Sequence, residues 1–74
     1  MITRKEYELL KQIKYYYPNC KKIQYNYRDG FVIYTSEPFE DFYIPYRMLS
    51  HIRTDGMVNI DKLIKKYEEV YLNE

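Results

Sequence analysis

Hydrophobic side chains recur along this chain first with the spacing of a helix and then with the spacing of a strand. Between Thr3 and about Tyr16 they return every three or four residues, which predicts an amphipathic helix. Thr3 and Glu6 have the spacing of a capping box, and Pro18 prevents the helix from continuing. The first element is therefore expected to be a helix with a well-marked start and end.

Polar and apolar residues alternate between Lys22 and Arg28, and the dipeptide Asp29-Gly30 then favours a tight hairpin turn. The return strand is expected over residues 31–36. A two-residue loop would place Tyr25 opposite Tyr34. In this register one face is the more apolar, and we expect it to lie against the helices; it comprises Ile23, Tyr25, Tyr27, Val32 and Tyr34.

Three shorter elements are expected in the second half of the chain. Residues 41–45 predict a third strand, which Pro45 restricts to an edge or an end of the sheet. Residues 46–53 predict a short helix. Asn59 is a candidate N-cap for a last amphipathic helix, whose apolar side chains recur at helical spacing over residues 60–71.

These elements together predict an α+β fold, as one small single domain over residues 1–74. The expected order is α-β-β-β-α-α, with a three-stranded antiparallel sheet that has helices on one face. A chain of 74 residues is shorter than an average domain, so no second domain is expected. Because so small a core leaves a thin margin of stability, we expect support from good helix packing or from a homodimer.

The charges of the chain nearly balance, with 12 basic and 11 acidic residues and a formal net charge of +1. No overall field then attracts the protein to nucleic acid or to anionic lipid. No apolar run is long enough to span a bilayer, and the N-terminal residues do not resemble a signal peptide. We therefore expect a cytoplasmic protein that does not bind membranes.

Few side chains in this sequence are suited to catalysis. The only cysteine, Cys20, and the only histidine, His51, lie on separate predicted elements, which provides neither a zinc site nor a nucleophile beside its base. The carboxylates of Glu37, Glu40 and Asp41 are close in sequence but lack the spacing of a calcium-binding loop. The sequence therefore predicts no enzyme, no bound metal and no cofactor.

One stretch of the chain interleaves basic and aromatic residues in the way that suits single-stranded nucleic acid. Cations contact the phosphates of such a strand while rings stack on its bases. The candidate residues for this function are Tyr15, Lys21, Lys22 and Arg28. The alternative is that the tyrosines nearby lie in the core and that the two lysines only keep a sheet edge soluble. Nucleic-acid binding is accordingly the second functional hypothesis.

Protein binding is the first functional hypothesis, and the tyrosine content supports it. Eleven tyrosines are more than so small a core can bury, and exposed tyrosine is typical of protein interfaces. An acidic turn beside exposed rings would fit a basic, apolar groove of a partner. The candidate partner-binding residues are Glu37, Phe39, Glu40, Asp41, Tyr43 and Tyr46. A coding bias towards AT-rich codons would also explain the tyrosine excess.

The composition also suggests a setting for this binding function. A short chain without alanine or tryptophan, and rich in lysine and tyrosine, resembles in style the accessory proteins of phages and mobile elements. Such a protein would act on a host protein. We therefore expect a non-enzymatic binding domain that inhibits or modulates a host protein by steric occlusion, for example as an anti-defence factor.

Overall fold

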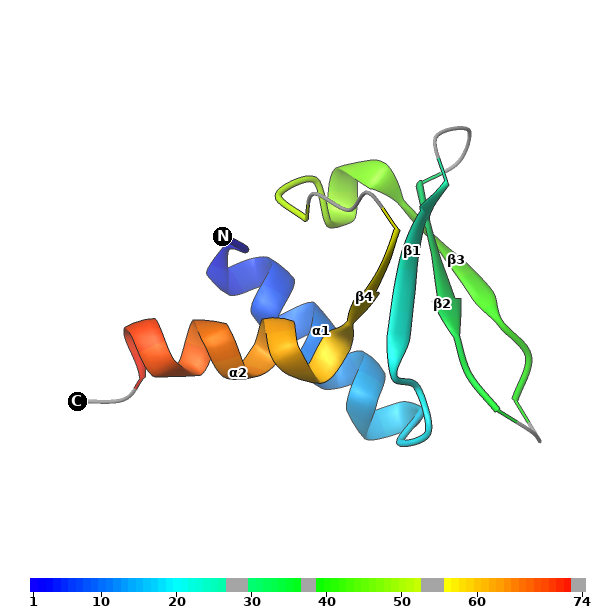
Figure 1. The fold of residues 1–74 in the computed structure, drawn as a ribbon, viewed down its shortest axis with the longest axis horizontal. Helices are drawn as coiled ribbons and strands as arrows, with labels where there is room; N and C mark the ends of the chain where they lie inside the picture. The colour runs from blue at the N-terminus through cyan, green and yellow to red at the C-terminus, as the bar shows by residue number, and fades with distance from the viewer. Residues whose placement is uncertain (27–29, 37–38, 53–55, 73–74) are drawn as a thin grey trace.

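In the described part of the chain, two α-helices lie on one face of a four-stranded antiparallel sheet (Figure 1). The computed structural model describes residues 1–26, 30–36, 39–52 and 56–72. The elements are α1 (Arg4–Tyr16), β1 (Lys22–Asn26), β2 (Gly30–Tyr34), β3 (Phe42–Pro45), the 3-10 turn η1 (Tyr46–Met48), β4 (Met57–Asn59) and α2 (Ile60–Tyr71). The strands lie in the sheet in the order β3-β2-β1-β4.

The first helix forms where the sequence predicts it, because a capping box satisfies the backbone groups at its start. Thr3 Oγ1 accepts a hydrogen bond from the Glu6 N–H at 3.3 Å, and Glu6 Oε1 accepts one from the Thr3 N–H at 2.7 Å. At the other end, Lys14 Nζ donates to the carbonyl oxygens of Pro18 at 3.3 Å and Cys20 at 2.6 Å. Lys14 therefore ties the segment after α1 back to the helix.

The hairpin of β1 and β2 is confirmed, but its predicted register is wrong. Tyr25 lies opposite Phe31 and not opposite Tyr34, while Ile23 lies opposite Ile33. Phe31 and Ile33 are both fully buried, so they share the inner face with Ile23. The register differs by three residues from the predicted one, and an odd difference turns the return strand over. Val32 and Tyr34, which were expected against the helices, therefore lie on the outer face.

Gly30 explains why the turn signal was misleading. This glycine belongs to β2, where it pairs with Asn26 on one side and Pro45 on the other. It has a positive φ of 124°, and a Cβ atom at this position would lie 2.3 Å from the Ile44 carbonyl oxygen. A glycine is required here because the backbone of β3 approaches so closely. The predicted partner in the turn, Asp29, lies outside the described residues.

The fold is α+β as expected, but the predicted three-stranded sheet and the order α-β-β-β-α-α are wrong, because the described residues form a four-stranded sheet in the order α-β-β-β-β-α. Strand β4 pairs with β1 over only three residues, Lys22–Gln24, which is too short to show an alternating pattern in the sequence. The Ile60 N–H donates to the Lys21 carbonyl at 2.8 Å, which continues this pairing into the start of α2.

The short helix expected over residues 46–53 is a single 3-10 turn in the structure, followed by further turns up to His51. Leu49 and Ile52 are buried, so their helical spacing reflects contact with the core and not a helix. Two further backbone bonds of this segment, from Leu49 to the Tyr46 carbonyl and from Ile52 to the Leu49 carbonyl, each span only three residues. Arg53, the last residue of the expected helix, lies outside the described residues.

The helices α1 and α2 run in opposite directions and enclose the core against the sheet. The Tyr7 ring stacks on the Tyr67 ring with centroids 4.4 Å apart, and Tyr7 Oη donates to Glu68 Oε2 at 2.7 Å. At the other end of the pair, Lys14 Nζ lies 3.3 Å from Asp61 Oδ1. The buried apolar core comprises Ile2, Leu10, Ile13, Cys20, Ile23, Phe31, Ile33, Ile44, Leu49, Ile52, Ile60, Ile64 and Tyr67.

The register of β2 predicts that one substitution has effects of very different size on stability at two neighbouring positions. Ile33→Thr removes buried apolar contacts and buries a hydroxyl, and should lower the free energy of unfolding by about 2–4 kcal/mol. Val32→Thr places the same side chain on the open face and should change it by about 0.5 kcal/mol or less. Urea denaturation followed by circular dichroism measures both. A larger loss for Val32→Thr than for Ile33→Thr would contradict the register.

Candidate functional site

The face of the sheet that the helices do not cover carries a row of four side chains, one from each strand. The pairing of the strands aligns Tyr43, Val32, Gln24 and Met57 across β3, β2, β1 and β4. Tyr43 is 61 % exposed and Met57 55 % exposed, so the described residues leave the row open to solvent. We call these four residues the central row.

A shallow hollow of about 580 Å³ lies beside the central row. Tyr34 stands at its end, opposite Lys22 in the sheet, and its hydroxyl donates to Gln24 Oε1 at 2.6 Å. This bond holds both polar side chains in place on the face. The lining residues are Gln24, Tyr25, Asn26, Val32, Tyr34, Asp41 and Tyr43. The hollow thus combines aromatic rings, amides and a single carboxylate.

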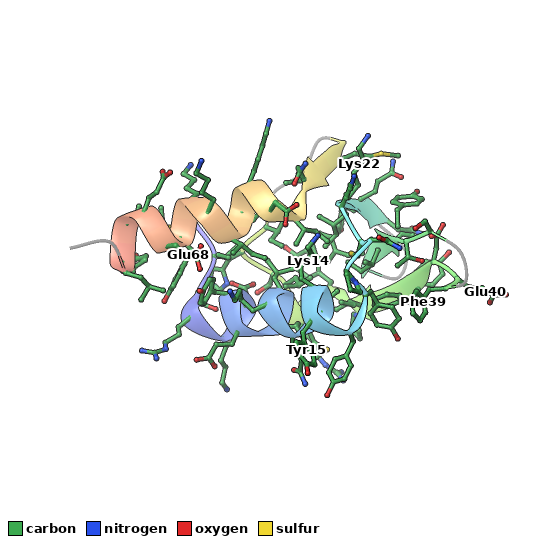
Figure 2. All side chains as sticks on the ribbon, turned by 90° about the horizontal axis from the view of Figure 1, so that it is seen from below. Lys14, Tyr15, Lys22, Phe39, Glu40 and Glu68 are labelled. Carbon is green, nitrogen blue, oxygen red and sulfur yellow. The ribbon has the colours of Figure 1, made fainter. Side chains whose placement is uncertain are left out.

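The acidic segment before β3 is held in a defined shape by its own hydrogen bonds. Asp41 Oδ1 accepts a bond from the Thr35 N–H at 2.8 Å, and Thr35 Oγ1 donates to the Phe39 carbonyl at 3.1 Å. The Phe39 ring packs edge-on against Tyr17 with centroids 5.2 Å apart. Figure 2 shows Phe39 and Glu40 together at one end of the molecule. This end therefore presents an acidic rim beside the hollow.

The structure brings together only part of the predicted partner-binding set. Asp41 and Tyr43 line the same hollow, and Phe39 and Glu40 lie next to them in the chain. Tyr46 follows the opposite end of β3, where its ring stacks on Phe31 with centroids 5.9 Å apart. Tyr46 is thus separated from the acidic rim by the length of the strand. Glu37 lies outside the described residues.

The residues of the nucleic-acid hypothesis do not form one patch in the described structure. Tyr15 is 77 % exposed on α1, whereas Lys21 and Lys22 are exposed at the start of β1. Figure 2 shows the side chains of Tyr15 and Lys22 pointing in opposite directions. Lys14, which directly precedes Tyr15 in sequence, is engaged with Asp61 and with backbone carbonyls. Arg28 lies outside the described residues.

Cys20 is fully buried beneath the helices, which makes it a poor nucleophile. Burial raises the pKa of its thiol, and the neighbouring Lys14 ammonium offsets this only in part. The thiol therefore stays protonated at neutral pH, whereas the reactive form of cysteine is the thiolate. Cys20 acts here as a small apolar side chain of the core.

A contact between the buried Glu6 carboxylate and the exposed His51 is a feature that the sequence did not reveal. Glu6 is only 4 % exposed, and its Oε2 accepts a bond from the His51 N–H at 3.0 Å. Its Oε1 lies 3.1 Å from His51 Nδ1. Glu6 was predicted as the capping residue of α1, but its second role involves a residue 45 positions away and gives no local signal.

The titration of Glu6 follows from this environment. Burial alone raises the pKa of the Glu6 carboxyl. The pKa is lowered more strongly by hydrogen bonds from the backbone N–H groups of His51 and Thr3 and from the Thr3 hydroxyl, and by the charge of His51. The pKa therefore lies below its ordinary value of 4.5. Glu6 is thus a carboxylate at neutral pH that joins the start of α1 to the turn before Ile52.

Ser50, His51 and Glu6 are the three residue types of a hydrolytic triad, but their geometry does not form one. Ser50 Oγ and Glu6 Oε1 both approach the same ring nitrogen, His51 Nδ1, at 3.5 and 3.1 Å. In a triad the imidazole takes the proton of the hydroxyl on one nitrogen while the acid holds the other. This cluster therefore cannot relay a proton from Ser50 to His51 in the required way.

Among the described residues, no three His, Cys, Asp or Glu side chains gather closely enough to hold a metal ion. None of the helices in this part of the chain is long and apolar enough to cross a membrane. In comparisons with known proteins, no protein-family model, no curated protein sequence and no solved structure matches this chain. The functional interpretation therefore depends on the surfaces described above.

The lowered pKa of Glu6 predicts how stability depends on pH. Replacing Glu6 by Gln should reduce the free energy of unfolding at pH 5 by about 1–2 kcal/mol, because two backbone donors lose a charged acceptor. A carboxyl with a depressed folded pKa stabilises above its unfolded pKa, and this contribution is lost as the pH falls through the folded value. The difference between Glu6→Gln and the wild type should therefore shrink at about pH 3.

Urea titrations at the two pH values measure this difference. Glu8→Gln is the matched control, because its ion pair with Arg4 is exposed and should contribute less than about 1 kcal/mol. An effect of Glu6→Gln that is equal at both pH values would contradict the assignment.

Proposed function

We propose that this protein is a non-enzymatic binding domain that covers a surface of another protein with the open face of its sheet. The observation that carries the proposal is the central row: Tyr43, Val32, Gln24 and Met57 lie side by side, and the described residues do not cover them. Large apolar side chains grouped on an exposed face are typical of interaction sites.

The residue types of this face support an interface. Tyrosine and methionine are enriched at the centres of protein interfaces, where tyrosine adds contact area at a low cost in side-chain entropy. Tyr43 and Met57 flank the row at its two edges, and the Tyr34–Gln24 hydrogen bond keeps the polar groups between them ordered. A surface that is ordered before binding loses less entropy when the partner arrives.

The charges around the central row indicate the chemistry of the partner. Asp41 lines the hollow and Glu40 precedes it, so the β3 side of this end of the face is acidic, whereas Lys22 lies across the sheet from it on β1. A matching partner surface has an apolar centre and a lysine or arginine that faces Asp41. Charge complementarity of this kind sets the orientation and speeds the encounter more than it raises affinity.

A small rigid fold that binds in this way acts by blocking access to the partner's surface. This mode of action suits an inhibitor or modulator of a host protein, such as an anti-defence factor. The resemblance in composition to phage accessory proteins supports that setting. Nucleic-acid binding is the alternative to be tested, because the rings of Tyr34 and Tyr43 on the sheet could also stack on bases.

The proposal predicts that binding depends on Tyr43 and not on an equally exposed tyrosine elsewhere. Purified wild-type protein on a resin should retain one specific protein from a host lysate at moderate salt. Tyr43→Ser should weaken the purified complex at least about 30-fold, the effect of a hot-spot residue of 2 kcal/mol. Tyr15→Ser, on the far side of α1, should leave it unchanged. Isothermal titration calorimetry measures all three affinities.

Two results would overturn the proposal. One is that Tyr43→Ser binds the partner as tightly as the wild type does, whether or not Tyr15→Ser loses affinity. The other is retention of single-stranded DNA with an affinity that falls steeply with salt and is lost on reversing the charges of Lys21 and Lys22. Thermal denaturation of each variant shows whether a loss of binding reflects a loss of folding.

A further inference from the structure

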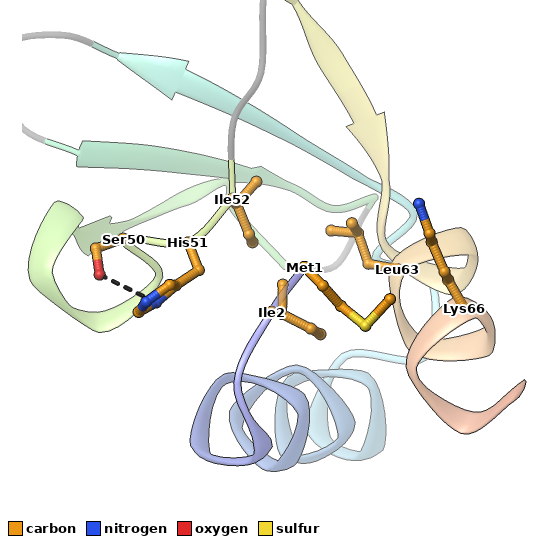
Figure 3. Close-up of a pocket in the computed structure, with 7 residues that line it drawn as sticks. All are labelled: Met1, Ile2, Ser50, His51, Ile52, Leu63 and Lys66. Atoms are coloured by element: carbon orange, nitrogen blue, oxygen red, sulfur yellow. Dashed lines mark hydrogen bonds between the residues drawn. The ribbon is translucent and has the colours of Figure 1, made fainter. Parts of the chain in front are cut away.

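A second cavity lies on the helical side of the sheet, between the N-terminal residues, the turn around His51 and α2 (Figure 3). Its volume is about 490 Å³, within the range of about 300–1,000 Å³ that small-molecule sites have. It is separate from the central row, so an inference drawn from it does not rest on the proposed function.

The walls of the cavity are apolar and partly rigid. Ile2 and Ile52 belong to the buried core, and Leu63 packs against that core from α2. Met1 adds an exposed, flexible thioether side chain to the same wall. These four side chains offer a surface for a short hydrocarbon chain.

The polar groups of the lining carry no negative charge. They are the Ser50 hydroxyl, the His51 imidazole and the Lys66 ammonium. Glu6 contacts His51 Nδ1, but its carboxylate is buried, accepts bonds from two backbone N–H groups and does not line this cavity. Among the described residues, no acidic side chain lies within 4.0 Å of the Lys66 ammonium. The cavity thus pairs an apolar wall with a cation that has no counter-ion within the described part of the chain.

We propose that this cavity binds a small monocarboxylate with an unbranched hydrocarbon chain. The Lys66 ammonium, on the α2 side of the cavity, pairs with the carboxylate, and the hydrocarbon chain reaches towards the turn of Ser50 to Ile52 on the other side (Figure 3). The hydrocarbon chain lies along Met1 and Leu63, the more exposed apolar side chains of the lining, and covers part of their apolar surface.

The occupied cavity would join three segments that are far apart in the sequence. The ligand contacts the N-terminal residues, the turn of Ser50 to Ile52 and the first half of α2. Because only the folded protein holds these groups together, a bound carboxylate raises the unfolding temperature in a concentration-dependent way. This linkage gives the experiment a second signal that is independent of the binding measurement.

Titration of the ¹⁵N-labelled protein with octanoate tests the proposal. Amide resonances of Ser50, Ile52 and Lys66 should shift with saturation and give a Kd on the order of 0.1–1 mM, as expected for a ligand of this size. Lys66→Gln should raise that Kd about three- to tenfold. Lys65→Gln, the neighbouring lysine outside the cavity lining, is the matched control and should leave it unchanged.

Chemical controls separate the two halves of the ligand. Octylamine has the same chain with a positive charge and acetate has the carboxylate without the chain, so both should bind at least about tenfold more weakly. The proposal is overturned if octylamine binds as well as octanoate, if Lys66→Gln has no effect, or if the shifts do not saturate. It is also overturned if the shifts fall on Tyr43 and Met57 instead of the cavity.

Discussion

The pairing of β1 with β2 decides which side chains this protein buries and which it displays. Ile23 opposite Ile33 places both under the helices, and the pairing of Gln24 with Val32 directs these two to the open face. A slip of one residue in either strand would turn the fully buried Phe31 and Ile33 towards water, at a cost of about 1.5–3 kcal/mol for each side chain. The core, the helical layer and the central row all follow from this register.

The sequence predicted the elements that depend on local signals and missed those that depend on distant contacts. The capping box of Thr3 and Glu6 and the Asn59 cap lie within a few residues of the groups they satisfy, and both are confirmed. The register could not be predicted because Gly30 is needed where the β3 backbone passes close to β2. This is a contact between strands, and the sequence around Gly30 indicates a turn instead. Strand β4 is too short to have a pattern of its own.

The candidate site shows the same division. The exposure of Tyr43 could be expected from the excess of tyrosine, but its alignment with Val32 and Met57 required the strand order. Tyr46 and Tyr43 lie close in sequence, yet Tyr46 follows β3 and packs on Phe31 instead. Residues along one strand move apart by about 3.3 Å each and alternate between the two faces, whereas residues opposite each other on adjacent strands lie side by side. Closeness in sequence is therefore a poor guide to which residues share a surface of the sheet.

The account therefore depends most directly on the register itself, which nuclear Overhauser effects between methyl groups can measure. With isoleucine methyl labelling, the account predicts strong effects between the methyl groups of Ile23 and Ile33. In uniformly labelled protein it also predicts effects between the side-chain protons of Gln24 and Val32 on the outer face. The opposite result would be Ile33 in contact with Asn26 and Ile23 in contact with Ser36. That pattern would bury Val32 and Tyr34 and remove the open face on which the binding function depends.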